Sequence, residues 1–239
     1  MDPILIVKTG TTLVSLASER GDFEDWIRAG MGLDRNQATV VSVFEGAKLP
    51  DPKDFAGVVI TGSGAMVSHR ESWSERTAEW LRDAVEHTTP VLGICYGHQL
   101  LAHALGGCVG PNPRGREIGT VRVRLAPEAA RDALLAGFGS ALRVHTTHSE
   151  SVLELPEPAV RLGSSQADPN SAFAFGTSAW GVQFHPEFDA HVMRRYIEER
   201  RELLVAEGID AEDRLDGVEE SPDGTTVLRR FYELLSGRA

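Results

Sequence analysis

The sequence predicts an α/β fold, in which a doubly wound, mostly parallel sheet is accompanied by a small antiparallel side sheet and C-terminal helices. Residues 4–7 and 57–60 are short, continuous apolar runs, which are typical of strands buried on both faces of a parallel sheet. Segments with helical periodicity alternate with such runs, as crossover connections require. After residue 107 the pattern changes to more exposed strands. We expect one domain over residues 1–239, with residues 189–239 forming a helical extension packed on it.

The first hundred residues supply the parallel half of the predicted sheet. Asp22 is a suitable N-cap for a helix. Phe23, Trp26 and Ile27 recur behind it at helical spacing. Similar patterns predict strands around residues 4–7, 40–43, 57–60 and 91–94, and helices around residues 73–85 and 100–105. Ligand sites in such sheets lie beyond the carboxyl ends of the strands, so the loops that follow these strands are candidate functional segments.

The second half of the chain supplies the other predicted elements. Apolar residues spaced over 118–125 predict a strand of the antiparallel side sheet. Short strands are predicted around residues 142–145, 152–155, 172–175 and 180–184, and helices around residues 193–197 and 227–235, with an acidic, turn-rich link at 208–223. We expect the charged residues of this C-terminal region to form a solvated face.

Composition restricts the class of protein. A chain of 239 residues suffices for one large α/β domain and is too short to add a separate synthetase domain. The formal net charge of −11 argues against a nucleic-acid or anionic-membrane surface. No run is long enough to span a bilayer and the start of the chain lacks a secretory signal pattern, so we expect a cytoplasmic protein. The only cysteines, Cys95 and Cys108, exclude a disulfide framework or a cysteine-based zinc site.

Cys95 stands where a predicted strand runs almost directly into a predicted helix. Gly93 and Gly97 flank it and give the Gly-x-nucleophile-x-Gly pattern of a nucleophile elbow. Such a tight turn can force the nucleophile into a strained backbone conformation. It also places the thiol near the positive end of the helix, where the thiolate is favoured. Because most unpaired cysteines are small core residues, Cys95 needs partners before it counts as a nucleophile.

His185 follows a predicted buried strand and offers such a partner. A histidine just beyond a strand can reach the Cys95 sulfur, while Pro186 limits the backbone turn and brings Glu187 towards the imidazole. The carboxylate would then fix the orientation of the base, as the third member does in other nucleophile-base triads. Cys95, His185 and Glu187 are therefore the candidate catalytic residues.

Two segments resemble the signature motifs of the class I, triad-type glutamine amidotransferases. These are GICYGHQLLA at residues 93–102 and GVQFHPEF at residues 181–188. The chain is most similar to free-standing members that resemble the glutaminase portion of GMP synthase. The resemblance implies the family's flavodoxin-like fold and a hydrolysis of L-glutamine to glutamate and ammonia through a γ-glutamyl thioester on Cys95. It implies no cofactor.

The same resemblance implies an oxyanion hole and a substrate site. The loop ITGSG at residues 60–64 is similar to the family loop that donates one backbone N-H, here that of Ser63. The second donor is the N-H of Tyr96, directly after the nucleophile. The implied substrate-binding residues are Gly62, Gln99, His148 and Ser149, although Gln99 has the alternative of hydrogen bonding at its own helix end.

His145 and His148 offer a metal pair as an alternative. Three-residue spacing on a strand sends the two side chains to opposite faces, and no third ligand lies close in sequence. We therefore expect a structural or substrate-loop role for these histidines and no metal site.

Other functions remain open at this point. No segment resembles an ATP-pyrophosphatase motif, so the ammonia is expected to pass to a synthetase subunit or to be released. A γ-glutamyl peptide hydrolase could use the same triad on a larger γ-glutamyl compound, and a site open beyond the γ-amide nitrogen would favour it. A catalytically idle binding or regulatory module of the same fold would have no chemical need of Cys95, His185 and Glu187 together.

Overall fold

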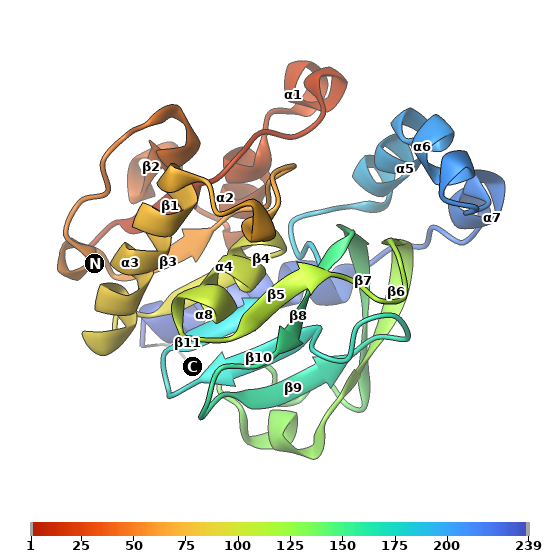
Figure 1. Ribbon diagram of the computed structural model, residues 1–239. Helices are drawn as coiled ribbons and strands as arrows, with labels where there is room; N and C mark the ends of the chain where they lie inside the picture. Colours follow the sequence, from red (N-terminus) through yellow and green to blue (C-terminus); the bar gives the residue numbers. More distant parts are fainter. Residues whose placement is uncertain (1, 238–239) are drawn as a thin grey trace.

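The structure is a computed structural model that describes residues 2–237, and its centre is a nine-stranded sheet (Figure 1). The strand order is β2-β1-β3-β4-β11-β10-β9-β6-β7. The first five strands in this order run parallel, and the later neighbours pair antiparallel. The strands of this sheet are β1 (Ile4–Lys8), β2 (Ala38–Ser42), β3 (Gly57–Ile60), β4 (Val91–Ile94), β6 (Glu117–Leu125), β7 (Ala141–His148), β9 (Val160–Ser164), β10 (Ala172–Phe175) and β11 (Ala179–Val182).

A second sheet and the helices complete the α/β architecture that the sequence predicts. The small sheet pairs β5 (Cys108–Pro111) with β8 (Glu150–Glu154) antiparallel. The α-helices are α1 (Val14–Arg20), α2 (Phe23–Met31), α3 (Ser72–Glu86), α4 (Tyr96–Ala104), α5 (Ala190–Glu199), α6 (Arg201–Ala206), α7 (Ala211–Asp216) and α8 (Pro222–Leu235).

The strand over residues 118–125 was expected in the side sheet, and this placement is wrong. These residues lie in β6, which pairs with β7 from Glu117 opposite His148 to Arg124 opposite Ala141, and with β9 on its other edge. The large sheet therefore continues into an antiparallel half, and the side sheet is made by β5 and β8. The apolar pattern showed a half-exposed strand but carried no information on its pairing partner.

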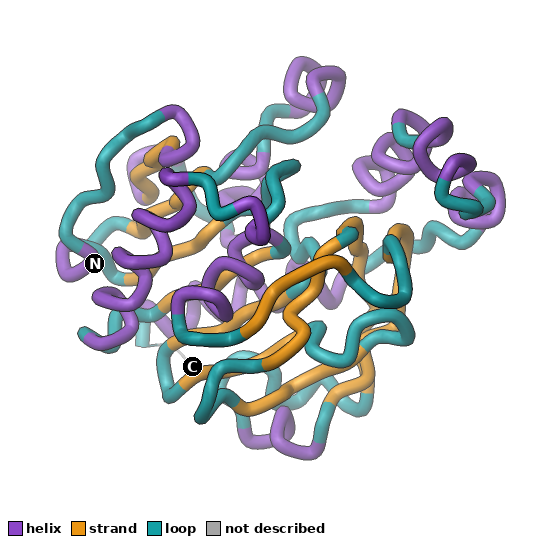
Figure 2. Tube along the Cα trace, viewed as in Figure 1, coloured by secondary structure: helices purple, strands orange, loops and turns teal. Residues whose placement is uncertain are grey.

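Alternation along β1 explains how the sheet is covered on both faces. Ile4 and Ile6 pack with the buried residues of α2 and α8, whereas Leu5 and Val7 pack with those of α3 and α4. Asp22 caps α2 as predicted, because its carboxylate accepts a hydrogen bond from the Phe23 N-H at 2.8 Å. Figure 2 shows helices gathered around the parallel half, while the antiparallel half consists mainly of strands and loops.

The C-terminal helices α5, α7 and α8 pack against β6, β7 and α2. Met193 and Ile197 of α5 belong to a third apolar cluster, which also contains Phe23 of α2 and Ile118 of β6. Figure 1 shows α5, α6 and α7 grouped beside the ends of β6 and β7. The helices predicted around residues 193–197 and 227–235 are confirmed as α5 and α8, but the expected turn-rich link also contains α7. Within residues 2–237, no helix has the length and apolar character needed to cross a membrane.

Candidate active site

Cys95 is the single residue between β4 and α4, and its backbone is strained. Its φ of 52° and ψ of −101° lie in a region that residues other than glycine rarely adopt. The flanking glycines permit this turn. A Cβ on Gly93 would collide with the backbone of Gly97, and a Cβ on Gly97 would lie 2.6 Å from the carbonyl oxygen of Ile60. The strained elbow predicted from the Gly-x-Cys-x-Gly pattern is therefore present.

The Cys95 side chain is almost completely buried. Only 6% of the residue is exposed, and its Sγ lies 3.8 Å from the carbonyl oxygen of Thr147. Two hollows nevertheless meet at this side chain. The thiol is therefore shielded from bulk water and still accessible to a bound molecule.

The structure brings His185 and Glu187 to Cys95. His185 lies close enough to the Cys95 side chain for each group to shift the pKa of the other, and its Nδ1 lies 2.7 Å from Glu187 Oε1. The imidazole is also stacked on the ring of Phe188, with 4.0 Å between the ring centroids. Both the base and the carboxylate are almost fully buried. The three residues thus form a continuous nucleophile-base-carboxylate series at the carboxyl end of β4.

Burial and neighbouring charges shift the pKa values of Cys95 and His185 in opposite directions. Burial raises the pKa of the Cys95 thiol, but the positive charge of His185 and its hydrogen bond outweigh burial and leave the pKa below its ordinary value. Burial lowers the pKa of His185, whereas the negative charges of Glu187 and of the Cys95 thiolate raise it to about 10. Both shifts favour a thiolate-imidazolium pair, the form in which the nucleophile is activated.

Ser63 and Tyr96, the expected oxyanion donors, lie beside the nucleophile. Both residues border a hollow that Cys95 also lines. In the described part of the chain neither backbone N-H has an acceptor, as a donor to a transition-state oxygen requires. The Tyr96 side chain points elsewhere, because its hydroxyl donates to Ser74 Oγ at 2.6 Å and its ring stacks on Trp73. Any contribution of Tyr96 to the chemistry therefore comes from its backbone.

Gly62 and Gln99 support the site from two sides. A Cβ on Gly62 would lie 2.8 Å from His185 Cε1, so the glycine allows the imidazole to approach the loop closely. Gln99 Nε2 donates to the carbonyl oxygen of Glu150 at 2.8 Å and to Gln183 Oε1 at 3.0 Å. The Gln99 amide therefore holds the segment after β7, and these bonds do not involve the end of its own helix.

His148 and Ser149 lie at the end of β7, next to Cys95. His148 shares one hydrogen bond with the carbonyl oxygen of Glu150 and one with the Glu117 carboxylate, at 2.8 and 3.2 Å. Burial lowers the pKa of His148, but the Glu117 carboxylate reverses this and leaves the pKa raised. The Ser149 carbonyl oxygen accepts from the Asn112 N-H at 2.8 Å. His145 is placed apart from this loop, beside the Thr120 hydroxyl.

No sequence pattern indicated Arg200, which also borders the nucleophile. It lies between α5 and α6, and its Nη1 donates to the Thr147 hydroxyl at 2.5 Å. Its charge was expected on a solvated face, and for this residue the expectation is wrong, because the guanidinium is turned inward beside Cys95. Arg116 was missed as well; it pairs with Glu207 at 2.8 and 3.0 Å. Packing of α5 against β6 and β7 brings Arg200 to the site, whereas Arg116 lies directly before β6.

The two hollows differ in their walls. The first, here called the serine-side hollow, has a volume of about 60 Å³. The second, here called the histidine-side hollow, has a volume of about 210 Å³. Cys95, Ser63, Gly64, Thr147 and Arg200 border both. The serine-side hollow is completed by Ala65, Met66, Tyr96, Gln99, Arg116, His148, Ser149 and Glu150, and the histidine-side hollow by Thr11, Thr12, Leu13, Phe23, His185 and Tyr196.

Comparison with known proteins agrees with this geometry. The sequence model described as "Glutamine amidotransferase class-I" matches residues 27–202. The chain is 37% identical over 155 residues to a GMP synthase [glutamine-hydrolyzing] of Porphyromonas gingivalis, an alignment that covers 64% of this chain but only 29% of that enzyme. It is 30% identical over 183 residues to gamma-glutamyl peptidase 5 of Arabidopsis thaliana, covering 74% of this chain and 72% of the relative.

Solved structures show the same fold. A glutamine amidotransferase from Methylobacillus flagellatus superposes with a TM-score of 0.75 at 25% identity, covering 100% of this chain and 94% of the other. A glutamine amidotransferase from Thermotoga maritima gives a TM-score of 0.77 at 24% identity, with 98% of each chain covered. The residues matched by the family model, 27–202, contain the cysteine, the histidine and the carboxylate described above.

Proposed function

This chain belongs to the class I glutamine amidotransferase family, and from this premise we propose that it hydrolyses the side-chain amide of L-glutamine to glutamate and ammonia. The observation that carries the proposal is the placement of Cys95, His185 and Glu187 in one buried series beside two hollows. The complete series also disfavours an idle binding module, which would have no chemical need of it.

The proposed reaction starts from the thiolate-imidazolium pair. The Cys95 thiolate attacks the side-chain amide carbon, and the negative oxygen that forms is stabilised by the N-H groups of Ser63 and Tyr96, each worth about 10²- to 10³-fold in rate. His185 gives its proton to the departing ammonia, and a γ-glutamyl thioester remains on Cys95. A water molecule then loses a proton to His185 and attacks the thioester, which releases glutamate and regenerates the Cys95 thiolate beside protonated His185.

A direct assay tests this proposal. The purified chain is incubated with L-glutamine, and glutamate and ammonia are measured separately, with the Cys95→Ala variant as the control. We expect both products in equal amounts from the wild-type chain and none above background from the variant. Equal product formation by the two proteins would contradict the proposal.

Hydrolysis of γ-glutamyl peptides is the second candidate, and the histidine-side hollow favours it. A volume of about 210 Å³ exceeds the space that departing ammonia needs. A relative named gamma-glutamyl peptidase, of which the alignment covers 72%, is consistent with this candidate. Comparing kcat/KM for glutamine and for γ-glutamyl dipeptides decides between the two substrates.

We also infer that the ammonia is either released or passed to a synthetase subunit. The GMP synthase relatives extend far beyond the aligned region, since the alignment covers 29% of the first of them. A synthetase partner should raise the glutaminase rate when it is added with its own substrates. No change in that rate on addition of a candidate subunit would argue against that partner.

A further inference from the structure

We propose that the histidine-side hollow binds the leaving group of a γ-glutamyl peptide, and that Arg200 binds the carboxylate of the amino acid that leaves. The proposal rests on the proposed function, because it requires Cys95 to attack a γ-glutamyl carbonyl carbon. It goes further by naming the hollow that takes the leaving amino acid and the residue that selects it.

The position of His185 identifies the side on which the leaving group departs. A general acid must lie within hydrogen-bond reach of the nitrogen that it protonates. His185 borders the histidine-side hollow, whereas the serine-side hollow is bordered by Gln99 and the segment after β7. The Cys95 sulfur borders both hollows, so the γ-glutamyl group extends towards the serine-side hollow and the departing nitrogen faces the histidine-side hollow.

The histidine-side hollow is larger than glutamine hydrolysis requires. Ammonia is about as large as water, whose share of liquid volume is about 30 Å³, while the hollow holds about 210 Å³. Its walls combine the hydroxyl-bearing Thr11 and Thr12 with the apolar Leu13 and Phe23. The Thr12 hydroxyl is hydrogen-bonded to that of Tyr196 at 2.8 Å, which ties the loop after β1 to α5. The space is therefore lined by walls of mixed polarity, as an amino acid needs.

Arg200 provides the charge that an amino acid's carboxylate would require. Its guanidinium lies 4.8 Å over the Tyr196 ring and donates to the Thr147 hydroxyl. Among residues 2–237 no carboxylate lies within ion-pair distance of it, in contrast to Arg116, which is paired with Glu207. A planar guanidinium has several donors and matches a carboxylate in a two-point contact. Arg200 is thus a half-buried cation with unused donors beside the reacting bond.

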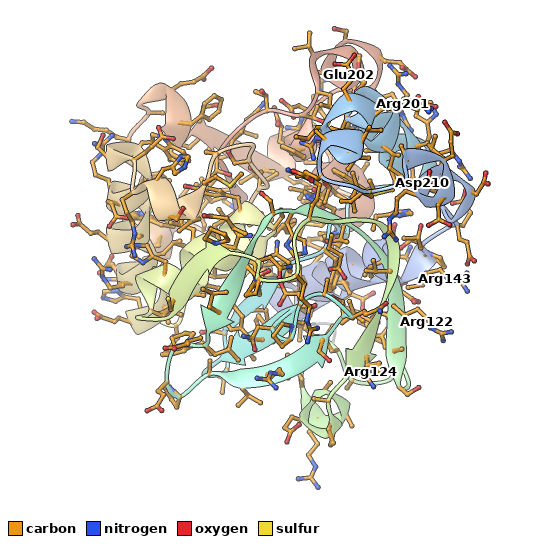
Figure 3. All side chains as sticks on the ribbon, turned by 45° about the vertical axis from the view of Figure 1, so that its right-hand side comes forward. Arg122, Arg124, Arg143, Arg201, Glu202 and Asp210 are labelled. Atoms are coloured by element: carbon orange, nitrogen blue, oxygen red, sulfur yellow. The ribbon has the colours of Figure 1, made fainter. Side chains whose placement is uncertain are left out.

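The adjacent Arg201 shows that the inward orientation of the guanidinium is specific to Arg200. Arg201 carries the same charge one position later, yet it is exposed and pairs with Glu212. Figure 3 shows Arg201 and Glu202 on the outer surface of the C-terminal helices. Arg201 is therefore a matched control for the loss of one positive charge.

The reaction balances with this substrate class. The bond from Cys95 Sγ to the γ-carbonyl carbon forms, the bond from that carbon to the amide nitrogen breaks, and the nitrogen takes the proton of His185. The free amino acid, whose carboxylate Arg200 binds during this step, then dissociates. Water hydrolyses the thioester to glutamate.

The test compares γ-glutamyl-alanine with γ-glutamyl-alaninamide, which differ only in the carboxylate. Because a hydrogen bond to a charged group changes an equilibrium by about 10- to 100-fold, we expect the wild-type kcat/KM to favour the carboxylate form by that factor. Arg200→Gln should reduce the ratio to about 1, and Arg200→Lys should retain part of it. Arg201→Gln should keep the wild-type ratio. A general structural defect would lower both rates together and leave the ratio unchanged.

Two results would overturn the inference while the proposed function stands. One is a wild-type ratio near 1 together with hydrolysis of glutamine, and this result does not depend on any variant. The other is an unchanged ratio in an Arg200→Gln protein whose thermal unfolding matches that of the wild type. Absence of hydrolysis of glutamine and of both peptides would instead refute the proposed function itself.

Discussion

The backbone N-H of His185 donates a hydrogen bond to the carbonyl oxygen of His145 at 2.8 Å, and the two residues form an isolated antiparallel bridge. His145 lies in β7, at the antiparallel edge of the sheet, whereas His185 follows β11 of the parallel half. The proposed general base is therefore fixed by both halves of the sheet. This bond joins residues that no local motif connects.

Replacing Cys95 should remove hydrolysis and leave the fold intact. Cys95→Ala deletes the nucleophile, and we expect glutamate release to fall at least about 1,000-fold. The other thiol, Cys108, is exposed, so Cys108→Ser should retain wild-type rates. Circular dichroism during heating checks that both variants are folded. Residual hydrolysis by folded Cys95→Ala near the wild-type rate would refute the nucleophile assignment.

The pH dependence should follow the thiolate-imidazolium pair. The pKa of Cys95 is lowered and that of His185 is raised to about 10. Activity should decline on the acid side as the thiolate gains a proton. It should decline again near pH 10, as His185 loses the proton that ammonia must receive. Measuring kcat/KM for glutamine across this range tests both limbs. An alkaline limb near the ordinary pKa of histidine would contradict the pairing.

Alkylation offers an independent check of the lowered thiol pKa. In a Cys108→Ser background, iodoacetamide should modify Cys95 at pH values below those at which an ordinary thiol reacts, because the thiolate is the reactive form. Adding His185→Ala should move the reaction to higher pH. No movement would show that His185 does not control the thiol.

Glu187→Gln should cause a milder loss than removal of Cys95. The amide still touches His185 but carries no charge, so the imidazole is held less firmly and its pKa falls. In a serine protease triad the orienting acid costs roughly 70-fold less than the nucleophile or base, and we expect a difference of that order here. The alkaline limb of the pH profile should also move to lower pH. Unchanged activity and an unchanged profile would argue against the triad.

Gly10→Ala should disturb the proposed oxyanion loop although residue 10 takes no part in the chemistry. A Cβ at Gly10 would lie 2.6 Å from Ser63 Oγ and 3.0 Å from Ser63 Cα, so Ser63 must move. Misplacing one oxyanion donor lowers kcat by about 10²- to 10³-fold. Gly64→Ala, whose Cβ would meet no atom within 4 Å, should have a clearly smaller effect. Equal rates for the two variants would mean that the position of Ser63 is unimportant.

Local patterns were sufficient for part of this molecule. Apolar runs and a cap at Asp22 predicted the parallel strands and α2, because these features depend on neighbouring residues. The short motifs around Cys95 and His185 also identified the residues that the structure brings together. The roles of Ser63, Gly62, Gln99, His148 and Ser149, and the single-domain organisation, stay predictions.

Other features depend on long-range packing and could not be predicted. The partners of β6 are set by pairing between distant strands, and its apolar pattern fits either sheet. Arg200 lies in a segment rich in charge, where its sequence neighbours face solvent. The break between α5 and α6, and the packing of α5 against β7, turn this guanidinium inward.

The strained backbone of Cys95 implies a compromise between thermal stability and activity. A non-glycine residue held at such dihedral angles costs about 1 to 3 kcal/mol of folding free energy, and glycine would avoid most of that cost. A variant with glycine in place of Cys95 should therefore be more thermostable than the wild type, although it has lost the nucleophile. Selection for thermal stability alone would be expected to remove the catalytic activity. Screens for more thermostable variants must therefore measure activity as well.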